Sequence, residues 1–317
     1  MSRDLSMKPD LLQLCPLMPS LEADLAERFT VHRLHEAADA EAFLATHGSA
    51  IKAVATGGHI GLPPAVGARL PALEIVAING VGYDKVDLAE ARRRGYRVAN
   101  TPDVLTEDVA DLAIGLTIAA LRQLVRGDGH VRAGQWPKGD LPLGRKMSRK
   151  KFGIVGLGRI GRAIAKRLQA FDGEIGYASR SPQDVPYRAF ESPAALAAWC
   201  DVLIIAAAAS AETRHLINGP VLEALGPKGV LVNVARGSLV DEKALLHAVQ
   251  HGQIAGAALD VFENEPHVPE GFHGLPNVVL TPHMASATHE TRADMAALVI
   301  ANLDAHFAGR ALPTPVV

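Results

Sequence analysis

The chain has 317 residues, of which 48% are hydrophobic and 21% are charged, and its formal net charge is −2. Single hydrophobic cores stop growing near roughly 250–300 residues, so this length favours two domains. The balanced charge excludes the basic surface by which proteins bind nucleic acid, and the hydrophobic content excludes a disordered chain. We therefore expect a folded protein that acts on a small molecule.

The chain has two cysteines, Cys15 and Cys200, and neither has a CxxC neighbour. Such usage argues against a disulfide framework or a structural zinc site and suits the reducing cytosol. Residues 1–20 contain too short an apolar run for a secretory signal. The most apolar stretches, 109–125 and 202–209, are too short to span a bilayer. We expect a cytoplasmic protein that holds no metal and crosses no membrane.

Short apolar runs alternate with helical patterns in the first part of the chain. This alternation is typical of a parallel sheet covered by helices. The segments are, in chain order, an apolar run at 11–16, a helix at 22–29, apolar runs at 42–48 and 51–58, a helix near 63–73 and an apolar run at 73–80.

A segment rich in Ala and Leu separates these elements from a second series. We expect a connecting helix over about 102–126 and an exposed loop over the Gly-rich segment 127–150. The alternation then resumes, which indicates a second α/β unit, and a final helix over about 288–308 can return to the first domain. The apolar runs of the second unit lie at 151–158, 174–180, 201–208, 230–237, 254–261 and 277–283, and its helices at 161–171, 192–200 and 241–252.

The segment KFGIVGLGRIGRAIAKRL places Gly156, Gly158 and Gly161 as G-x-G-x-x-G between an apolar strand and an amphipathic helix. There the first glycine permits a tight turn, the second lets a pyrophosphate approach the backbone, and the third allows close packing of strand and helix. The N–H groups at the helix start, around Arg159 and Ile160, favour phosphate. We predict a dinucleotide site; the alternative is an ordinary strand-to-helix turn with incidental glycines.

The next strand, in EIGYASRSPQ, lacks the acidic residue that would accept the adenosine ribose hydroxyls. Ser179 stands in that position, followed by Arg180 and Ser181. Hydroxyls and a guanidinium suit a 2′-phosphate, which a carboxylate would repel. We therefore predict NADPH as the preferred cofactor, with NADH second. The alternative is that Arg180 is a solvated surface charge with no ligand.

The segment NVARGSLVDEKAL follows another apolar strand. Open α/β sheets place their ligand crevice at such strand ends, so Arg236 can project over it and hold a carboxylate through two hydrogen bonds. Val234 and Ala235, just before it, are expected to line the cofactor. The alternative is a structural arginine that pairs with Asp241 or Glu242.

Two later strand ends carry a carboxylate and an imidazole. Glu265 lies in the loop of AGAALDVFENEP, and His283 follows a proline in NVVLTPHMASATHETR. Reduction of a 2-keto acid needs a proton donor for the forming alkoxide, and a carboxylate bonded to a histidine would fix its tautomer and stabilise its protonated form. Singly, His283 can be a surface or core histidine, and Glu263 and Glu265 can be loop charges. The order Arg, Glu, His after a dinucleotide turn favours a catalytic trio.

Together these motifs resemble the D-isomer-specific 2-hydroxyacid dehydrogenase family over nearly the whole chain. The segments that carry the resemblance are GLGRIG, NVARG, DVFENEP, TPH and residues 79–111. Within the family, the chain is most similar to glyoxylate/hydroxypyruvate reductases. The resemblance implies NADPH-dependent reduction of glyoxylate to glycolate or hydroxypyruvate to D-glycerate, with His283 as general acid, Glu265 as its partner and Arg236 on the substrate carboxylate.

The resemblance also implies an α/β fold of two doubly wound parallel-sheet domains. A discontinuous, flavodoxin-like substrate domain would comprise about residues 1–99 and 287–317, and a Rossmann NAD(P)-binding domain about residues 100–286. Family members are usually homodimers. Trp136 is similar to a tryptophan that some members insert into the partner subunit's active site; the alternative is an aromatic residue that packs in a loop or interface.

Other positions take their expected roles from the resemblance alone. Backbone amides of Gly57 and Gly58, with Val81 and Gly82 nearby, would bind the substrate carboxylate, since a glycine leaves its N–H accessible. The residues expected at the cofactor are Thr106, which would line it, Asp260, which would meet the nicotinamide amide, and Ala285, which stands with Met284 where many members read H-x-G.

Several alternatives stay open from the sequence. Other D-2-hydroxyacid dehydrogenases differ in the first domain's pocket, and phosphite dehydrogenases share the Arg, Glu and His set. From a different class, the chain also resembles dinucleotide-binding corepressors that recruit peptides. The physiological 2-keto acid and the direction of the reaction are not fixed by the sequence.

Overall fold

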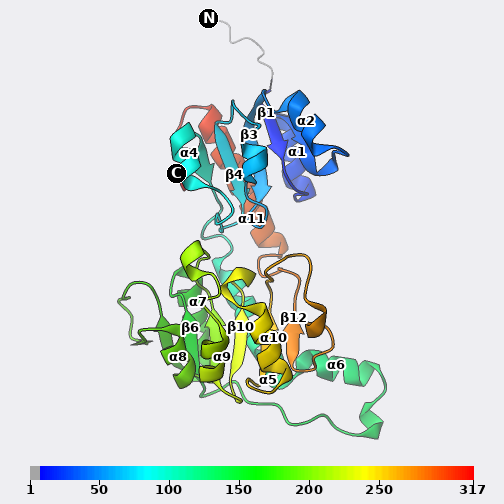
Figure 1. Ribbon diagram of the computed structural model, residues 1–317, viewed down its shortest axis with the longest axis vertical. Coiled ribbons are helices and arrows are strands. Elements are labelled where there is room, and N and C mark those ends of the chain that lie inside the picture. The colour runs from blue at the N-terminus through cyan, green and yellow to red at the C-terminus, as the bar shows by residue number, and fades with distance from the viewer. Residues whose placement is uncertain (1–7) are drawn as a thin grey trace, which may run out of the picture. The chain divides into compact units, whose positions relative to one another are not determined.

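The computed structural model describes residues 8–317, which separate into two units (Figure 1). Unit 1 contains the chain up to Leu105 together with Ala287–Val317, and unit 2 contains Thr106–Ser286. The sequence predicted the first boundary between the two domains at residues 99 and 100. The structure places it at Thr106, the first residue of helix α5 (Thr106–Arg122). Residues 1–7, which the predicted substrate domain included, lie outside the described part of the chain.

In the described part of unit 1, a five-stranded sheet has the order β2-β1-β3-β4-β5, and all pairings between these strands are parallel. This is the flavodoxin-like order. The strands are β1 (Asp10–Gln13), β2 (Thr30–Arg33), β3 (Ile51–Gly57), β4 (Ile75–Asn79) and β5 (Arg97–Ala99). The helices are α1 (Pro19–Arg28), α2 (Ala40–His47), α3 (Pro64–Gly67), α4 (Leu88–Arg94) and α11 (His289–Phe307), with a 3-10 turn η1 (Leu34–Glu36).

Helices cover both faces of this sheet, which explains why its inner strands are continuous apolar runs. One core cluster joins the sheet to α1 and α11, through residues such as Leu25 and Val299. A second cluster joins it to α2 and α4, through Leu44 and Ala91. The C-terminal helix α11 therefore completes the unit that the N-terminal part of the chain begins, as the sequence allowed.

Between Thr106 and Ser286, a seven-stranded sheet has the order β12-β11-β10-β9-β6-β7-β8, with parallel pairings throughout. The direction of winding reverses between β6 and β9, which is where sheets of this kind bind their ligands. The strands are β6 (Lys151–Val155), β7 (Glu174–Ala178), β8 (Arg188–Ala189), β9 (Val202–Ile205), β10 (Val230–Asn233), β11 (Gly256–Leu259) and β12 (Val278–Leu280).

The helices of unit 2 lie on both sides of its sheet (Figure 1). Helix α5 packs against α7 and against β10, β11 and β12. The helices are α5 (Thr106–Arg122), α6 (Leu124–Arg132), α7 (Arg159–Leu168), α8 (Pro193–Trp199), α9 (Gly219–Leu225) and α10 (Glu242–Gln250). The 3-10 turns are η2 (Trp136–Lys138), η3 (Gln169–Phe171), η4 (Ala211–Thr213), η5 (Gly237–Leu239) and η6 (Glu270–Phe272).

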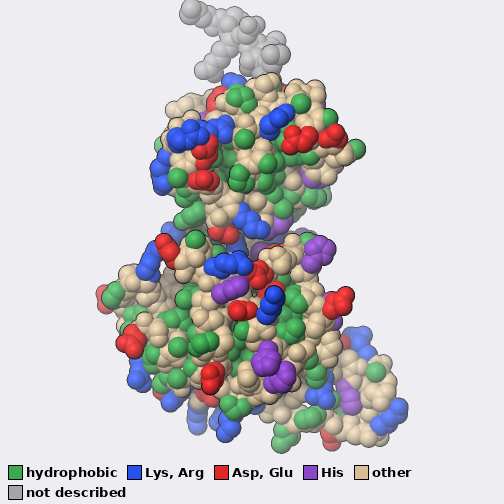
Figure 2. Space-filling view, in the orientation of Figure 1, with side chains coloured by type: hydrophobic (Ala, Val, Ile, Leu, Met, Phe, Trp, Pro, Cys, Tyr) green, Lys and Arg blue, Asp and Glu red, His purple; other side chains and the backbone are tan. Residues whose placement is uncertain are grey.

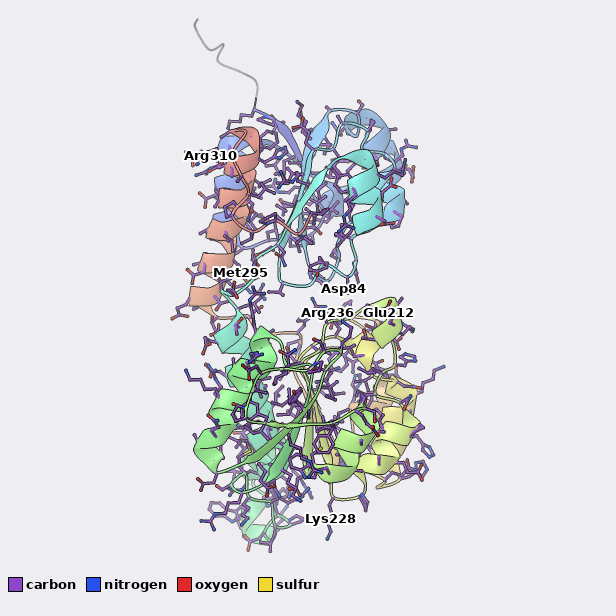
Figure 3. All side chains as sticks on the ribbon, turned by 90° about the vertical axis from the view of Figure 1, so that its left-hand side faces the viewer. Asp84, Glu212, Lys228, Arg236, Met295 and Arg310 are labelled. Atoms are coloured by element: carbon purple, nitrogen blue, oxygen red, sulfur yellow. The ribbon has the colours of Figure 1, made fainter. Side chains whose placement is uncertain are left out.

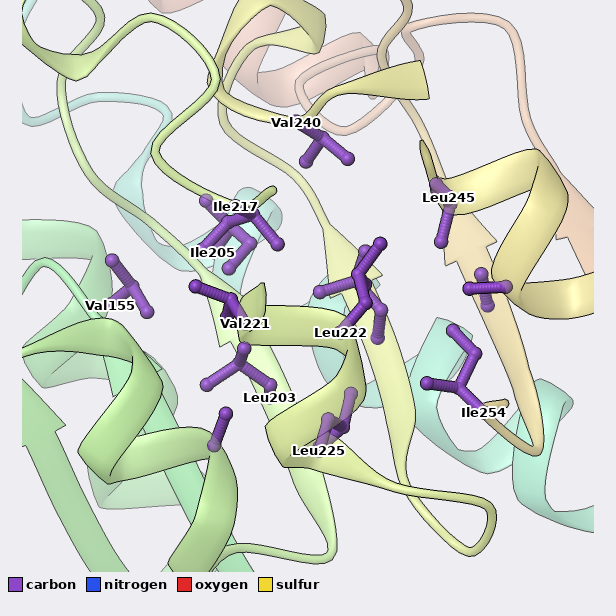
Figure 4. Close-up of a cluster of buried hydrophobic side chains, with 14 of the residues drawn as sticks. Val155, Leu203, Ile205, Ile217, Val221, Leu222, Leu225, Val240, Leu245 and Ile254 are labelled. Atoms are coloured by element: carbon purple, nitrogen blue, oxygen red, sulfur yellow. The ribbon is translucent and has the colours of Figure 1, made fainter. Parts of the chain in front are cut away.

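The other face of this sheet packs on α8, α9 and α10 through the aliphatic cluster drawn in Figure 4. Leu203 and Ile205 of β9 meet Leu222 of α9 and Leu245 of α10, and all four side chains are buried. Burial of each such side chain contributes about 1.5–3 kcal/mol. This rigid layer fixes the strand ends on which the site is built.

The predicted fold class is confirmed: both units are doubly wound α/β layers on parallel sheets. The prediction of an exposed loop from residue 127 was wrong in part, because α6 continues to Arg132. Gln123 takes a left-handed conformation, with φ of 54°, and so ends α5 and starts a second helix in a new direction. The sequence did not predict β2, the apolar run at 42–48 lies in helix α2 and not in a strand, and the helix expected near 63–73 is the four-residue α3. Among residues 8–317, no helix has both the length and the apolar character that crossing a bilayer requires.

Candidate active site

The glycine-rich turn joins β6 to α7, and its three glycines have different surroundings. Gly156 has φ of 91°, and a Cβ on it would lie 2.5 Å from the Cα of Ala207. A Cβ on Gly161 would lie 2.1 Å from the carbonyl oxygen of Gly156, so both positions require glycine for packing. A Cβ on Gly158 would meet nothing within 4 Å. The space left beside Gly158, at the N-terminus of α7, fits the pyrophosphate of a dinucleotide.

Arg159 and Ile160 form the first turn of α7, where N–H groups without helical partners point toward that space. Thr106 is the first residue of α5, and Val234 and Ala235 follow β10 directly. All of these predicted cofactor residues belong to unit 2. The predicted roles of Thr106, Val234 and Ala235 stay predictions.

The loop after β7 holds the residues that were expected to bind a 2′-phosphate. Arg180 is exposed, but the Ser179 hydroxyl donates to the carbonyl oxygen of Ser181 at 2.5 Å. In this conformation the Ser179 proton is not available to a phosphate. Gln183 Nε2 donates to the same carbonyl at 3.2 Å, and Arg162 donates to Gln183 Oε1 at 2.6 Å. Arg162 is thus a second guanidinium that braces this loop, and the sequence prediction missed it.

His283 follows β12 and lies in a left-handed conformation, with φ of 50°. Its backbone N–H donates to the carbonyl oxygen of Asp260 at 2.8 Å, which stabilises this uncommon geometry. Its ring Nδ1 lies 2.7 Å from Glu265 Oε2. Because an ionised carboxylate only accepts hydrogen bonds, Nδ1 carries the hydrogen in this pair. The structure therefore brings together the predicted acid and its predicted partner.

The environment of Glu265 keeps its side chain ionised. Burial acts to raise its pKa, but the hydrogen bond and charge of His283, the N–H of Phe262 and the charge of Arg236 together act the other way, and the pKa is lowered from 4.5. The Phe262 N–H donates to Glu265 Oε1 at 2.9 Å. One carboxylate oxygen is thus held by backbone and the other by the imidazole.

Arg236 lies between β10 and η5, at the end of unit 2 opposite Lys228, which precedes the same strand (Figure 3). The buried side chain of Asn233 shapes its backbone: Nδ2 donates to the Arg236 carbonyl at 3.0 Å, and Oδ1 accepts from the Ala235 N–H at 3.1 Å. Arg236 Nη1 donates to the Ala235 carbonyl at 2.8 Å. The charge of Arg236 acts on Glu265, so all three predicted catalytic residues lie in one neighbourhood.

Asp260, which the resemblance assigns to the nicotinamide amide, lies directly after β11. Its side chain is fully buried, and its carboxylate accepts from Thr281 Oγ1 at 2.6 Å, from the Met284 N–H at 2.9 Å and from the Ala285 N–H at 3.0 Å. In the structure this carboxylate organises the loop that carries His283. Its predicted contact with the nicotinamide amide stays a prediction.

The predicted substrate loops of unit 1 lie next to each other. Gly57 ends β3, and a Cβ on Gly80 would lie 3.3 Å from the backbone nitrogen of Gly58. The Gly57 N–H donates to Cys15 Sγ at 3.2 Å, so this N–H is already engaged. The Val81 carbonyl accepts from Asn100 Nδ2 at 2.8 Å. The predicted substrate contacts of Gly58, Val81 and Gly82 stay predictions.

Trp136 lies in η2, beyond α6, and 62% of its surface is exposed. Its Nε1 donates to Asp140 at 3.2 Å.

Within residues 8–317, no group of three or more His, Cys, Asp or Glu side chains is arranged to hold a metal ion.

Sequence reasoning singled out the residues that could do chemistry and missed those that hold them. Asn233 and Glu242 are polar residues buried beside the trio, and Arg162 supports the loop after β7. The signals were a polar side chain at the end of an apolar strand and a second arginine after GRIG. The partners of Arg162 and Glu242 lie 21 residues away in the sequence, so these two signals do not reveal them.

The chain is similar to known proteins in both sequence and fold. Residues 114–285 match the model of the D-isomer specific 2-hydroxyacid dehydrogenase NAD binding domain. Glyoxylate/hydroxypyruvate reductase A of Arabidopsis thaliana and hydroxyphenylpyruvate reductase of Plectranthus scutellarioides are each 49% identical over 308 residues, which cover 97% of this chain and 98% of each relative. The crystal structure of NADPH-dependent glyoxylate/hydroxypyruvate reductase from Sinorhizobium meliloti, in complex with NADP and malonate, has a TM-score of 0.92 and 45% identity and covers 98% of this chain and 97% of its own.

The family model matches within unit 2, whereas the relatives and the crystal structure match over both units; together they confirm the resemblance inferred from the motifs. The chain therefore belongs to the D-isomer specific 2-hydroxyacid dehydrogenase family, whose members are oxidoreductases.

Proposed function

We propose that the protein is an NADPH-preferring reductase of small 2-keto acids, with glyoxylate and hydroxypyruvate as its substrates. The observation that carries the proposal is the 2.7 Å contact between His283 Nδ1 and Glu265 Oε2, beside Arg236. The relatives named for glyoxylate and hydroxypyruvate reduction support the choice of substrate.

In this reaction NADPH, when bound, supplies the hydride that reduces the substrate's C2 carbonyl. His283 gives the proton to the forming alkoxide from Nε2, since Nδ1 is bonded to Glu265. Glu265 remains ionised and stabilises the protonated imidazole before transfer. Arg236 holds the substrate carboxylate through its planar fork, which also polarises the neighbouring carbonyl. In unit 1, we predict that the N–H groups of Gly58, Val81 and Gly82 contribute to carboxylate binding.

The preference for NADPH is inferred from the loop after β7. Ser179, Arg180 and Ser181 contain no acidic side chain, and Arg162 adds a second guanidinium beside them. The relative from Sinorhizobium meliloti, which is NADPH-dependent, supports the same choice. The ratio of kcat/KM for NADPH to that for NADH tests it, and a ratio of one or below would refute it.

The substrate is best identified by a panel of glyoxylate, hydroxypyruvate, pyruvate, phenylpyruvate and hydroxyphenylpyruvate, each with both cofactors. We expect the highest kcat/KM with glyoxylate or hydroxypyruvate. A clear preference for the aromatic acids would instead assign the chain a function like that of the relative named hydroxyphenylpyruvate reductase. Absence of turnover with every member of the panel would reject the proposed function.

A homodimer is part of the proposal. Most of the exposed large hydrophobic side chains of the described chain gather on α6 and the segment after it, which stand out from unit 2 (Figure 1). An apolar surface of this kind favours a second copy of the chain as its cover. The residues are Leu124, Val125, Val131, Trp136 and Leu143. Light scattering after size exclusion should give twice the chain mass, and Val131→Asp should lower it; a monomeric wild type would contradict the proposal.

A cytoplasmic location is also proposed, because Cys15 and Cys200 are both buried free thiols. Burial is the main cause of the raised pKa of each thiol, which for Cys200 is about 12, so neither is a reactive thiolate near neutral pH. Fractionation of cells that express the protein tests this location, and recovery in an organelle or outside the cell would contradict it.

A further inference from the structure

Glu242 is a buried carboxylate beside the turn that carries Glu265. It is the first residue of α10, after the N-cap Asp241, and only 9% of its surface is exposed. Its Oε1 accepts a hydrogen bond from the backbone N–H of Glu263 at 2.7 Å. Burial of a carboxylate costs hydration energy, which hydrogen bonds within the protein must offset. An apolar residue at the same place would avoid this cost. Its position therefore calls for a physical reason.

The group that Glu242 binds belongs to the turn that carries Glu265. The N–H of Phe262 donates to Glu265 Oε1, and the N–H of the next residue, Glu263, donates to Glu242. Two successive N–H groups of this turn are thus each held by a carboxylate, one from the turn itself and one from α10. The second oxygen of Glu265 then reaches His283 at 2.7 Å. Glu242 fixes the backbone from which Glu265 makes this contact.

The same peptide is in direct contact with the segment that carries Arg236. A Cβ on Gly237 would lie 1.9 Å from the carbonyl carbon of Phe262 and 2.2 Å from the nitrogen of Glu263. Because only glycine fits there, η5 lies against the peptide that Glu242 holds. The Phe262–Glu263 peptide therefore connects the position of Arg236 to that of Glu265.

Several charged side chains lie near Glu242. One of them, Glu263, pairs with Arg214 and with His215 Nε2, the latter at 3.0 Å, so the charge of Glu263 is balanced locally. Side chains of both charge signs and of histidine gather on this face of unit 2 near α10 (Figure 2). Burial raises the pKa of Glu242, the Glu263 N–H acts in the opposite direction, the charges of Glu263 and Glu265 raise it further, and that of His215 lowers it. On its own helix, Asp241 and Lys243 are the adjacent charged residues.

We propose that Glu242 is a positioning residue for the reaction: by accepting the Glu263 N–H, it holds the Phe262–Glu263 peptide so that Glu265 bonds His283. The inference deepens the proposed function and rests on it. Holding the peptide needs an acceptor oxygen and does not need a charge, so the role can be separated chemically from a charge effect.

The test compares E242Q, which keeps an acceptor oxygen but removes the charge, with E242L, which removes both. Matched controls are E223Q and E223L on the exposed side of α9. For each variant, kcat and KM for hydroxypyruvate are measured from about pH 5 to pH 9, together with the thermal midpoint and the NADPH dissociation constant. The NMR resonance of the His283 Nδ1–H, which is bonded to Glu265, provides a readout that does not depend on turnover, and H283N assigns it.

We expect E242L to lose roughly 10–100-fold in kcat, as misplacement of a catalytic pair predicts, with its NADPH dissociation constant within about 2-fold of wild type. E242Q keeps an acceptor oxygen, so it should recover most of kcat and leave the His283 Nδ1–H resonance near its wild-type position, whereas E242L should shift or broaden that resonance. Wild-type kcat in both variants would overturn the inference. So would equal losses in E242Q and E242L with an unchanged resonance, because that result indicates a structural role only.

The two proposals fail in different ways. If the wild type reduces none of the 2-keto acids, the proposed function fails, and the His283 Nδ1–H resonance in E242L still decides whether Glu242 positions the pair. If the wild type is active and E242L changes neither kcat nor this resonance, the role assigned to Glu242 is wrong. E242A, which also removes the acceptor oxygen, gives the same comparison with E242Q if E242L does not fold.

Discussion

The carbonyl oxygen of Asp260 accepts the backbone N–H of His283 at 2.8 Å, while the carboxylate of the same aspartate accepts the N–H groups of the two residues that follow the histidine. One buried residue thus holds His283 in its left-handed conformation from both sides of the loop. A histidine with φ of 50° is uncommon and needs such support. The proposed proton donor is therefore held by hydrogen bonds of the protein itself.

Replacement of His283 by alanine should abolish most turnover and leave the cofactor site intact. General acid catalysis contributes about 10²–10⁴-fold, so we expect kcat to fall by that factor while the NADPH dissociation constant stays within about 2-fold. Steady-state kinetics and fluorescence titration measure the two quantities. His251→Ala, at the exposed C-terminal end of α10, is the control. Wild-type turnover in His283→Ala would refute its role as general acid.

Replacement of Asp260 by asparagine should destabilise the protein and slow the reaction together. An amide has one acceptor oxygen, so at least one of the three donors that Asp260 binds would lose its partner, at a cost of about 1–3 kcal/mol. Urea denaturation gives the change in the free energy of unfolding, with Glu223→Gln as a surface control. If Asp260 instead contacts the nicotinamide, its variant should lose cofactor affinity with unchanged stability.

Glu265 makes folding stability depend on pH in a defined direction. Its pKa in the folded protein is lowered from 4.5, so the folded state binds this proton less readily than the unfolded state. The stabilisation is present above the unfolded pKa of about 4.5 and is lost as the pH falls through the lower folded value. Glu265→Gln should therefore flatten the pH dependence of the unfolding free energy below about pH 5. Parallel curves for wild type and variant across that range would contradict this cause.

The loop after β7 should decide between the two cofactors. A hydrogen bond to a charged group contributes about 1.5–3 kcal/mol, so Arg180→Ala should weaken binding of 2′,5′-ADP by roughly 10–100-fold. Binding of 5′-AMP, which has no 2′-phosphate, should be unchanged and serves as the control. Calorimetry measures both, and an equal loss for the two nucleotides would show that Arg180 does not read the 2′-phosphate.

Alanine substitutions of the second and third glycines of the turn should impair the protein for different reasons. Gly158→Ala places its methyl group in open space, so the variant should fold with wild-type stability and bind NADPH more weakly, because the methyl occupies the predicted pyrophosphate position. Gly161→Ala would bring its Cβ to 2.1 Å from a backbone oxygen and should destabilise unit 2 itself. Thermal unfolding and NADPH titration separate the two outcomes. Loss of stability in Gly158→Ala would show that the space is not open.

The features that the sequence predicted well are those in which all determinants lie within a few residues. The strand, the three glycines and the helix around Gly158 are contiguous, so the turn and its use are encoded locally. The two parallel sheets follow from the repeated alternation of apolar runs and helices. Arg236, Glu265 and His283 were found because each follows its own strand, and the carboxyl ends of parallel strands lie at the same edge of a sheet.

Local patterns also misled where a single residue decides the backbone. Nothing in the Gly-rich composition of 127–150 indicates that the left-handed Gln123 ends one helix and starts α6. The hydroxyl of Ser179 looked free for a phosphate, but the turn brings the Ser181 carbonyl within 2.5 Å of it. Such contacts depend on the local φ and ψ values, which the residue types alone do not fix.

The sequence by itself determined the fold class and the family, and it singled out the side chains proposed to transfer a proton and hold a carboxylate, because strand periodicity and short motifs are local. Only the tertiary structure decided that Asp260 is buried under His283 and that Glu242 binds the turn of Glu265. These pairings join residues of different elements, such as Glu242 of α10 and Glu263 after β11, and they exist only when the sheet brings their ends together. The sequence does not distinguish a carboxylate that faces solvent from one that binds a buried N–H, because tertiary packing determines which of the two occurs.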